Sequence, residues 1–113
     1  IDMTLKKYLD KAKMEKHLDI KFELIKKRRM VVINKKTEIY LTQLEFILME
    51  CFIRNAGELV EYKKLIKSAW GNDYCITKSQ LAYAIFHLRR KLNDKNKRFI
   101  KTVQSRGYVL MCG

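Results

Sequence analysis

Long apolar runs are missing from this 113-residue sequence. No stretch approaches the roughly 18 to 20 consecutive apolar residues that a membrane-spanning helix needs. The first 19 residues are rich in lysine and lack the apolar segment and small-residue cleavage site of a secretory signal peptide. The length suits one domain, and we expect that domain to be cytoplasmic.

Cysteine, histidine and glycine are also scarce. The three cysteines, Cys51, Cys75 and Cys112, form no CxxC pair, and only His17 and His87 could join them as zinc ligands. No metal site, cofactor or disulfide is therefore predicted. With four glycines the chain has no phosphate-binding glycine pattern, and no Ser-His-Asp arrangement is evident. The sequence thus argues against an enzyme.

Acidic residues are few where basic residues are many. The formal net charge is +13, and residues 76–113 carry nine basic side chains against one acid, Asp94. A basic protein can be drawn to anionic lipid as well as to nucleic acid. The concentration of charge in the last third favours nucleic acid and makes that third the candidate contact region.

The N-terminal extension, residues 1–19, is predicted to be helical. Apolar residues recur there at helical spacing from Thr4 to about His17. Its role is left open between a helix packed on the edge of the domain, a dimer contact and a linker. Residues 20–113 are predicted to form the domain proper.

A small antiparallel sheet is expected next, because short β-prone runs alternate with turn-forming residues. The runs are Ile20 to Ile25, Met30 to Ile33 and Glu38 to Leu41. The basic segment Lys26 to Arg29 between the first two runs is interpreted as a solvated hairpin turn rather than a nucleic-acid contact.

The first helix of the domain has a well-determined start. Thr42 is the predicted N-cap, Glu45 closes a capping box three residues later, and Leu41 with Phe46 forms a hydrophobic staple. A stop is predicted at Asn55 to Gly57. The predicted buried stripe consists of Leu44, Ile47, Leu48 and Cys51.

Two further helices follow. The second is predicted from about Glu61 to Ala69, with Leu65, Ile66 and Ala69 buried. The third begins with another capping box, in which Thr77 is the N-cap and Gln80 closes the box.

The third helix, Thr77 to Leu92, has two different faces. A spacing of 100° per residue places its leucines and Ile85 on one side, which is the core side. The other side carries aromatic, polar and basic residues, which suits a helix laid in a DNA major groove. The core side consists of Leu81, Ile85, Leu88 and Leu92, and the free side of Ser79, Tyr83, Phe86, His87 and Arg90.

A β-hairpin is predicted at the end of the chain. Its strands are Phe99 to Val103 and Tyr108 to Met111, and Arg106 lies at its tip, where a guanidinium can reach phosphates or a narrow minor groove. Three helices followed by a basic hairpin make an α+β fold of the winged helix-turn-helix kind.

Five motifs, in order, resemble the signatures of OmpR/PhoB-type DNA-binding domains. The resemblance covers about residues 20–111 and implies a four-stranded N-terminal sheet, three helices and a C-terminal wing. The motifs are Leu41-Thr42-Gln43-Leu44-Glu45-Phe46, Ala69-Trp70-Gly71, Leu88-Arg89-Arg90-Lys91-Leu92, Ile100-Lys101-Thr102-Val103 and Arg106-Gly107-Tyr108.

The resemblance also implies site residues. Trp70 matches a tryptophan whose indole N–H reaches a phosphate while its rings fill the core edge. Base and phosphate contacts are expected from Ser79, Gln80, Tyr83 and His87, backbone contacts from Arg89 or Arg90, and wing contacts from Thr102 and Arg106.

Departures from the family pattern put base recognition in question. Phe86 and His87 occupy helix positions that are often arginine, and Gln104 replaces a common wing arginine. Arginine grips guanine in a bidentate manner that neither Phe nor His reproduces. The wing tip and the centre of the helix are most similar to the ToxR/CadC subgroup, which implies a membrane segment following Gly113.

Two hypotheses from different classes are kept. The first is sequence-specific binding of double-stranded DNA by a bacterial transcription regulator, with two copies on a repeated site. The copies on DNA would form a homo- or heterodimer. The alternative is a winged-helix interaction module that contacts RNA polymerase or a partner regulator, with little DNA specificity. Its contact residues would be Asn72, Asp73, Tyr74 and Phe86.

Overall fold

The structure is a computed structural model that describes residues 20–71, 75–94 and 97–111. The helix predicted in the N-terminal extension and the loop residues Asn72 to Tyr74 lie outside these residues. The fold class is confirmed as α+β. The elements are β1 (Phe22–Ile25), the 3-10 helix η1 (Lys26–Arg28), β2 (Met30–Ile33), β3 (Thr37–Tyr40), α2 (Gln43–Arg54), β4 (Leu59–Glu61), α3 (Tyr62–Trp70), α4 (Lys78–Leu92), β5 (Ile100–Val103) and β6 (Gly107–Leu110).

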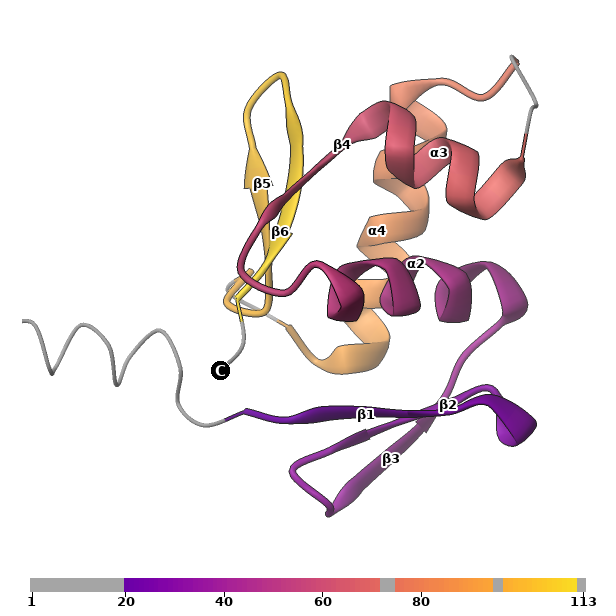
Figure 1. The fold of residues 1–113 in the computed structure, drawn as a ribbon, viewed down its shortest axis with the longest axis vertical. Coiled ribbons are helices and arrows are strands. Elements are labelled where there is room, and N and C mark those ends of the chain that lie inside the picture. Colours follow the sequence, from indigo (N-terminus) through magenta and orange to yellow (C-terminus); the bar gives the residue numbers. More distant parts are fainter. Residues whose placement is uncertain (1–19, 72–74, 95–96, 112–113) are drawn as a thin grey trace, which may run out of the picture.

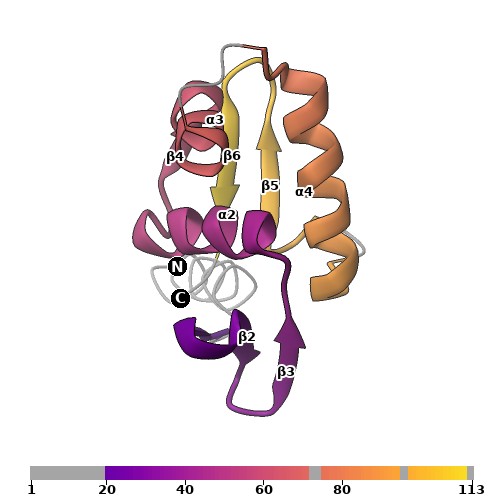
Figure 2. The ribbon, with the colours of Figure 1, turned by 90° about the vertical axis from the view of Figure 1, so that its right-hand side faces the viewer.

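The elements form layers along the long axis of the molecule. Sheet β1–β3 lies below α2, α3 and the β5–β6 hairpin lie above it, and α4 runs from the upper end of the molecule past α2 (Figure 1). Figure 2 shows the same order from the side and places β5 between α4 and β6. The hairpin turn and the first turn of α4 therefore lie at the same end of the molecule, opposite the sheet.

The N-terminal sheet is an antiparallel meander in the order β1-β2-β3. Leu24, Val31 and Ile39 are aligned across its three strands, and Val31 is fully buried against the helices. Residues Lys26 to Arg29 are exposed, as predicted for a turn. The described residues contain three strands here, so the four-stranded sheet implied by the family resemblance is corrected to three in this part of the chain.

Helix α2 begins with the predicted capping box. The Thr42 hydroxyl accepts from the Glu45 backbone N–H at 3.2 Å, and the Glu45 carboxylate accepts from the Thr42 N–H at 2.8 Å. The predicted stripe is wrong in part, since Leu44 and Ile47 are only half-buried. The helix crosses the centre of the domain and is covered on more than one side. Its buried residues are Glu45, Phe46, Leu48, Met49, Cys51 and Phe52.

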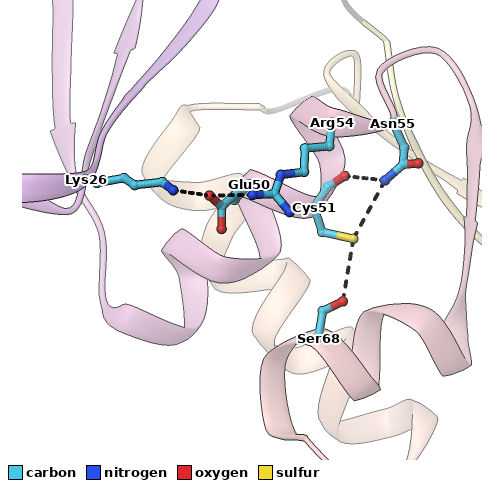
Figure 3. A network of polar contacts seen from close by, with 6 residues as sticks. All are labelled: Lys26, Glu50, Cys51, Arg54, Asn55 and Ser68. Carbon is cyan, nitrogen blue, oxygen red and sulfur yellow. Dashed lines mark hydrogen bonds and ion pairs between the residues drawn. The ribbon is translucent and has the colours of Figure 1, made fainter.

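Polar contacts join α2 to its neighbours on both sides (Figure 3). Glu50 pairs with Lys26 of η1 and with Arg54 one turn later, each at 3.4 Å. On the α3 side, the buried sulfur of Cys51 lies 3.9 Å from the Ser68 hydroxyl. The Glu50 ion pairs add little stability, because both basic partners are largely exposed to solvent.

The predictions missed strand β4. Residues Leu59–Glu61 pair antiparallel with β6, which makes the wing a three-stranded sheet in the order β4-β6-β5. Three residues between two helices are too short to show a strand periodicity. In α3 only Leu65 is fully buried, whereas Ile66 and Ala69, which were predicted to be buried, are half-buried.

Gly107 allows the wing to lie against β4. A Cβ at this position would collide with the backbone carbonyl of Val60 and would lie 2.9 Å from the Cα of Glu61. Only glycine permits such close approach of two backbones.

Within the described residues, no helix is both long and apolar enough to cross a bilayer.

Candidate nucleic-acid interface

The outer face of α4 carries large exposed side chains. Tyr83 is 67% exposed and Phe86 is 52% exposed. The imidazole of His87 stands between these two rings, edge to face with Tyr83 at 4.4 Å and with Phe86 at 5.4 Å between centroids. The opposite face is buried as predicted, with Leu81, Ile85, Leu88 and Leu92 in the core, joined by Ala84.

A groove runs along one side of this face and brings together five of the predicted contact residues. It lies between the start of α2, the end of α3 and the first three turns of α4. The structure thus collects residues that are separated by up to 17 positions in the chain. The five are Trp70, Ser79, Gln80, Tyr83 and His87.

Two of these five residues also stabilise the fold. Trp70 is half-buried and packs against the hydrophobic core, as predicted for its rings. The carboxamide oxygen of Gln80 accepts from the Thr77 backbone N–H at 2.9 Å and closes the second capping box. The Gln80 oxygen is therefore engaged, and the NH₂ group is the part of this side chain suited to donate to a phosphate.

A second groove lies on the other side of the exposed face. Phe86 and Arg90 line it one turn apart, and the Arg90 guanidinium lies 5.8 Å from the centre of the Phe86 ring. Ala82, one turn before Phe86, is exposed and lines the same groove. Phe86 thus stands apart from the groove that holds Tyr83 and His87. The remaining lining residues are Arg89, Asn93, Asp94 and Lys97.

Arg89 is directed toward the wing. Its guanidinium donates to the Ile100 carbonyl from Nε at 3.0 Å and from Nη2 at 2.7 Å, and from Nη2 to the Thr102 hydroxyl at 2.9 Å. It also lies 5.6 Å from the centre of the Tyr108 ring. Burial lowers the pKa of Arg89 and raises that of Tyr108, and the guanidinium stays charged at neutral pH. Of the two arginines predicted to hold the DNA backbone, Arg90 is the exposed one.

Asp94 organises the connection from α4 to the wing, and sequence reasoning missed it. Its buried carboxylate accepts from the backbone N–H groups of Arg98 at 2.6 Å, Phe99 at 3.0 Å and Ile100 at 2.9 Å. A signal was present in the sequence, because Asp94 is the single acid among nine basic residues. Because aspartate side chains readily accept hydrogen bonds from backbone N–H groups a few residues away, a local backbone role could have been predicted for it.

The wing carries the remaining predicted residues. Arg106 is exposed in the turn between β5 and β6, and its backbone carbonyl accepts from the Tyr62 N–H at 3.2 Å. The exposed Thr102 lies on β5, where its hydroxyl accepts from Arg89. These two residues belong to the wing and do not line the groove that collects the α4 side chains.

Three helices followed by a hairpin that is tied to the last helix define a winged-helix domain. The family model described as "Transcriptional regulatory protein, C terminal" matches residues 36–110. Because this match covers more than half of the chain, the chain belongs to that family. The OmpR/PhoB-type resemblance is thereby confirmed.

Relatives with similar sequences are transcription regulators. The chain is 38% identical over 74 residues to the DNA-binding dual master transcriptional regulator RpaA of Synechocystis sp., which covers 64% of this chain and 31% of RpaA. It is 30% identical over 93 residues to the transcriptional regulatory protein CusR of Escherichia coli, which covers 81% of this chain and 40% of CusR. The chain thus spans about a third of the length of the first of these relatives.

Solved structures share the fold. The DNA-binding domain of Bacillus subtilis CssR superposes with a TM-score of 0.68 at 26% identity, covering 80% of this chain and all of that domain. The Klebsiella pneumoniae RstA DNA-binding domain in complex with the RstA box also gives 0.68, at 25% identity, covering 79% and 89%. The E. coli CadC domain gives 0.68 at 24% identity, covering 81% and 87%, which shows the fold alone.

Proposed function

We propose that this chain binds double-stranded DNA in a sequence-specific manner and is the DNA-binding domain of a bacterial transcription regulator. In this proposal α4 enters the major groove and the β5–β6 hairpin lies near the minor groove. The observation that carries the proposal is the exposed face of α4, where half-exposed rings and a guanidinium project from a helix whose other face is fully buried.

Charge and relatives support the same function. The net charge of +13 supplies the sequence-independent attraction to phosphates that DNA-binding proteins use. RpaA is described as a DNA-binding regulator, and the RstA domain was solved in complex with its DNA box. A binding domain needs a rigid scaffold under its contact helix, and the buried side of α4 provides it.

The contacts divide into two kinds. Ser79, Tyr83 and His87 face outward from α4 and are assigned to bases or nearby phosphates. Donors at the edges of the interface are assigned to the DNA backbone, which fixes the position of the helix without specifying sequence. These donors are the Trp70 indole N–H, the Gln80 NH₂, Arg90, the Thr102 hydroxyl and Arg106.

The test is selection of bound duplexes from a random library by the purified chain, followed by affinity against salt. We expect one recurring motif and an affinity that falls steeply as salt rises. Arg106→Ala should weaken both the selected and an unrelated duplex and reduce the slope of log affinity against log salt by about 0.9. Lys36→Ala, in the β2–β3 turn at the opposite end of the molecule, is the matched control and should leave the slope unchanged.

A second candidate function is an interaction module, favoured by the exposure of Phe86. Its partner would be RNA polymerase or another regulator, and two copies on one DNA site would serve the first function as well. A complex that forms without DNA, is insensitive to salt and is lost in Phe86→Ala would favour this candidate. Either function would operate in the cytoplasm.

A further inference from the structure

The first three turns of α4 lack the usual means of recognising guanine on their outer face. Among residues 78–88 the single lysine or arginine is Lys78, and its ammonium lies 4.7 Å from the centre of the Tyr62 ring, back toward α3. Arg89 is bound to the wing strand. Arg90 comes after three turns of the helix. The bidentate arginine contact to guanine is therefore missing from the part of the helix that normally meets base edges.

In its place the second groove presents an apolar surface. Ala82 and Phe86 line it one helical turn apart, both exposed, and Arg90 follows one turn later. The Phe86 ring is held between His87, edge to face at 5.4 Å, and the Arg90 guanidinium at 5.8 Å. These contacts orient the ring without covering it, since half of the residue stays exposed.

An oriented apolar surface of this kind has one partner in the major groove. Of the four bases, only thymine presents a methyl group there, and alanine and phenylalanine are side chains that contact it. Cytosine carries hydrogen at the same ring position, so a methyl group distinguishes a T·A pair where hydrogen-bonding groups are lacking. Arg90 and Lys97 at the same groove are placed to neutralise the phosphates beside such a base.

We propose that Phe86, together with Ala82, recognises the C5-methyl group of thymine in the major groove. The preferred DNA site is then specified along this part of α4 by thymine and not by guanine. This inference rests on the proposed function and adds the chemical class of base that the helix selects.

The experiment uses the duplex selected by the whole chain and replaces each thymine in turn by uracil. Uracil pairs with adenine in the same way and lacks only the methyl group. We expect at least one position where uracil weakens binding about fourfold, because the complex no longer buries one methyl-sized apolar group. In Phe86→Ala the same replacement should have no effect. Replacing that thymine by cytosine should weaken binding, and 5-methylcytosine should restore part of the loss.

Three controls make the result specific. Phe86→Leu keeps an apolar side chain and should keep part of the sensitivity to uracil. Lys97→Ala removes a cation from the same groove that has no contact with the Phe86 ring, so it should weaken all duplexes and leave the thymine-to-uracil ratio unchanged. Tyr40→Ala removes a ring from β3 that is more exposed than that of Phe86, and this variant should bind as the unmodified chain does. Thermal unfolding of each variant checks that it is folded.

The outcomes separate this inference from the function on which it rests. If a motif is selected but no thymine responds to uracil, or Phe86→Ala responds equally, thymine recognition is overturned while DNA binding stands. If no motif is selected, both fail. If Phe86→Ala abolishes self-association in sedimentation while binding DNA with unchanged preference, the Phe86 surface is a protein contact instead.

Discussion

Two neighbouring arginines of α4 lie in very different surroundings. The Arg89 guanidinium makes three hydrogen bonds to β5 and lies against the buried ring of Tyr108. Arg90 is exposed and stacks near Phe86 on the outer face. One helix therefore has a side that holds the wing and a side available to a ligand. Two adjacent arginines therefore differ in role, since Arg89 positions the wing and Arg90 is left exposed for the proposed contact with DNA.

The wing-facing side depends on close backbone packing, and Gly107→Ala should disturb it most. A Cβ there collides with the Val60 carbonyl, so β4 and β6 must separate. We expect a loss of about 3 kcal/mol in the free energy of unfolding, at the upper end for overpacking, measured by urea denaturation. Gly57→Ala is the matched control, because its Cβ would meet open space and only the positive φ of +80° opposes it. That variant should lose about 1 kcal/mol, and equal losses in the two variants would contradict the proposed collision.

Asp94 is the next most sensitive point on this side. In Asp94→Ala three backbone N–H groups lose their acceptor, and a loss of about 2 to 3 kcal/mol is expected by urea denaturation. Asp94→Asn keeps one carbonyl acceptor and should lose less. Glu38→Ala, an exposed acid on β3, should change stability by no more than about 0.5 kcal/mol. An unchanged free energy of unfolding in Asp94→Ala would mean that water replaces the carboxylate as the acceptor.

The two arginines themselves give the sharpest contrast. Arg89→Ala should lower the free energy of unfolding by about 2 kcal/mol, because it leaves the Ile100 carbonyl without its charged donor. Arg90→Ala should change it by less than about 0.5 kcal/mol and should instead weaken DNA binding and reduce its salt dependence. The measurements are urea denaturation and affinity against salt for both variants. Equal losses of stability in the two variants would contradict the different roles given to Arg89 and Arg90.

Much of the scaffold could be predicted because its signals are local. Both capping boxes and the core side of α4 follow from residues three or four positions apart, and the structure confirms them. Strand β4 and the direction of Arg89 could not be predicted in this way. Strand β4 depends on its pairing with β6, a strand that comes much later in the chain. Helical spacing placed Arg90, and not Arg89, on the free side of the helix, but it could not show that Arg89 reaches Ile100 and Thr102 of β5. Helical spacing placed Ser79, Tyr83 and His87 on the free side of the helix, and the family resemblance added Trp70 and Gln80 as contact residues. The groove that collects them was not predicted.

The smallest expected effect concerns Glu45 and Lys91, which join the start of α2 to the end of α4. Burial raises the pKa of Glu45, but the hydrogen bond from Lys91 and those from Thr42 outweigh burial and lower the pKa below its ordinary value. A carboxylate with a lowered folded-state pKa contributes stability that is present above its unfolded-state pKa. That contribution is lost as the pH falls through the folded-state pKa.

Lys91→Met should therefore flatten the acid part of the stability curve. The expected change is less than about 1 kcal/mol, because the lysine side chain is 37% exposed and solvent screens the pair. Urea denaturation in steps from about pH 6 to pH 3 spans the ordinary range of a carboxyl pKa. Lys36→Met, an exposed lysine in the β2–β3 turn, removes the same charge elsewhere and corrects for net charge. If the two variants lose stability in parallel as the pH falls, Glu45 owes its lowered pKa to the capping box and not to the contact between the two helices.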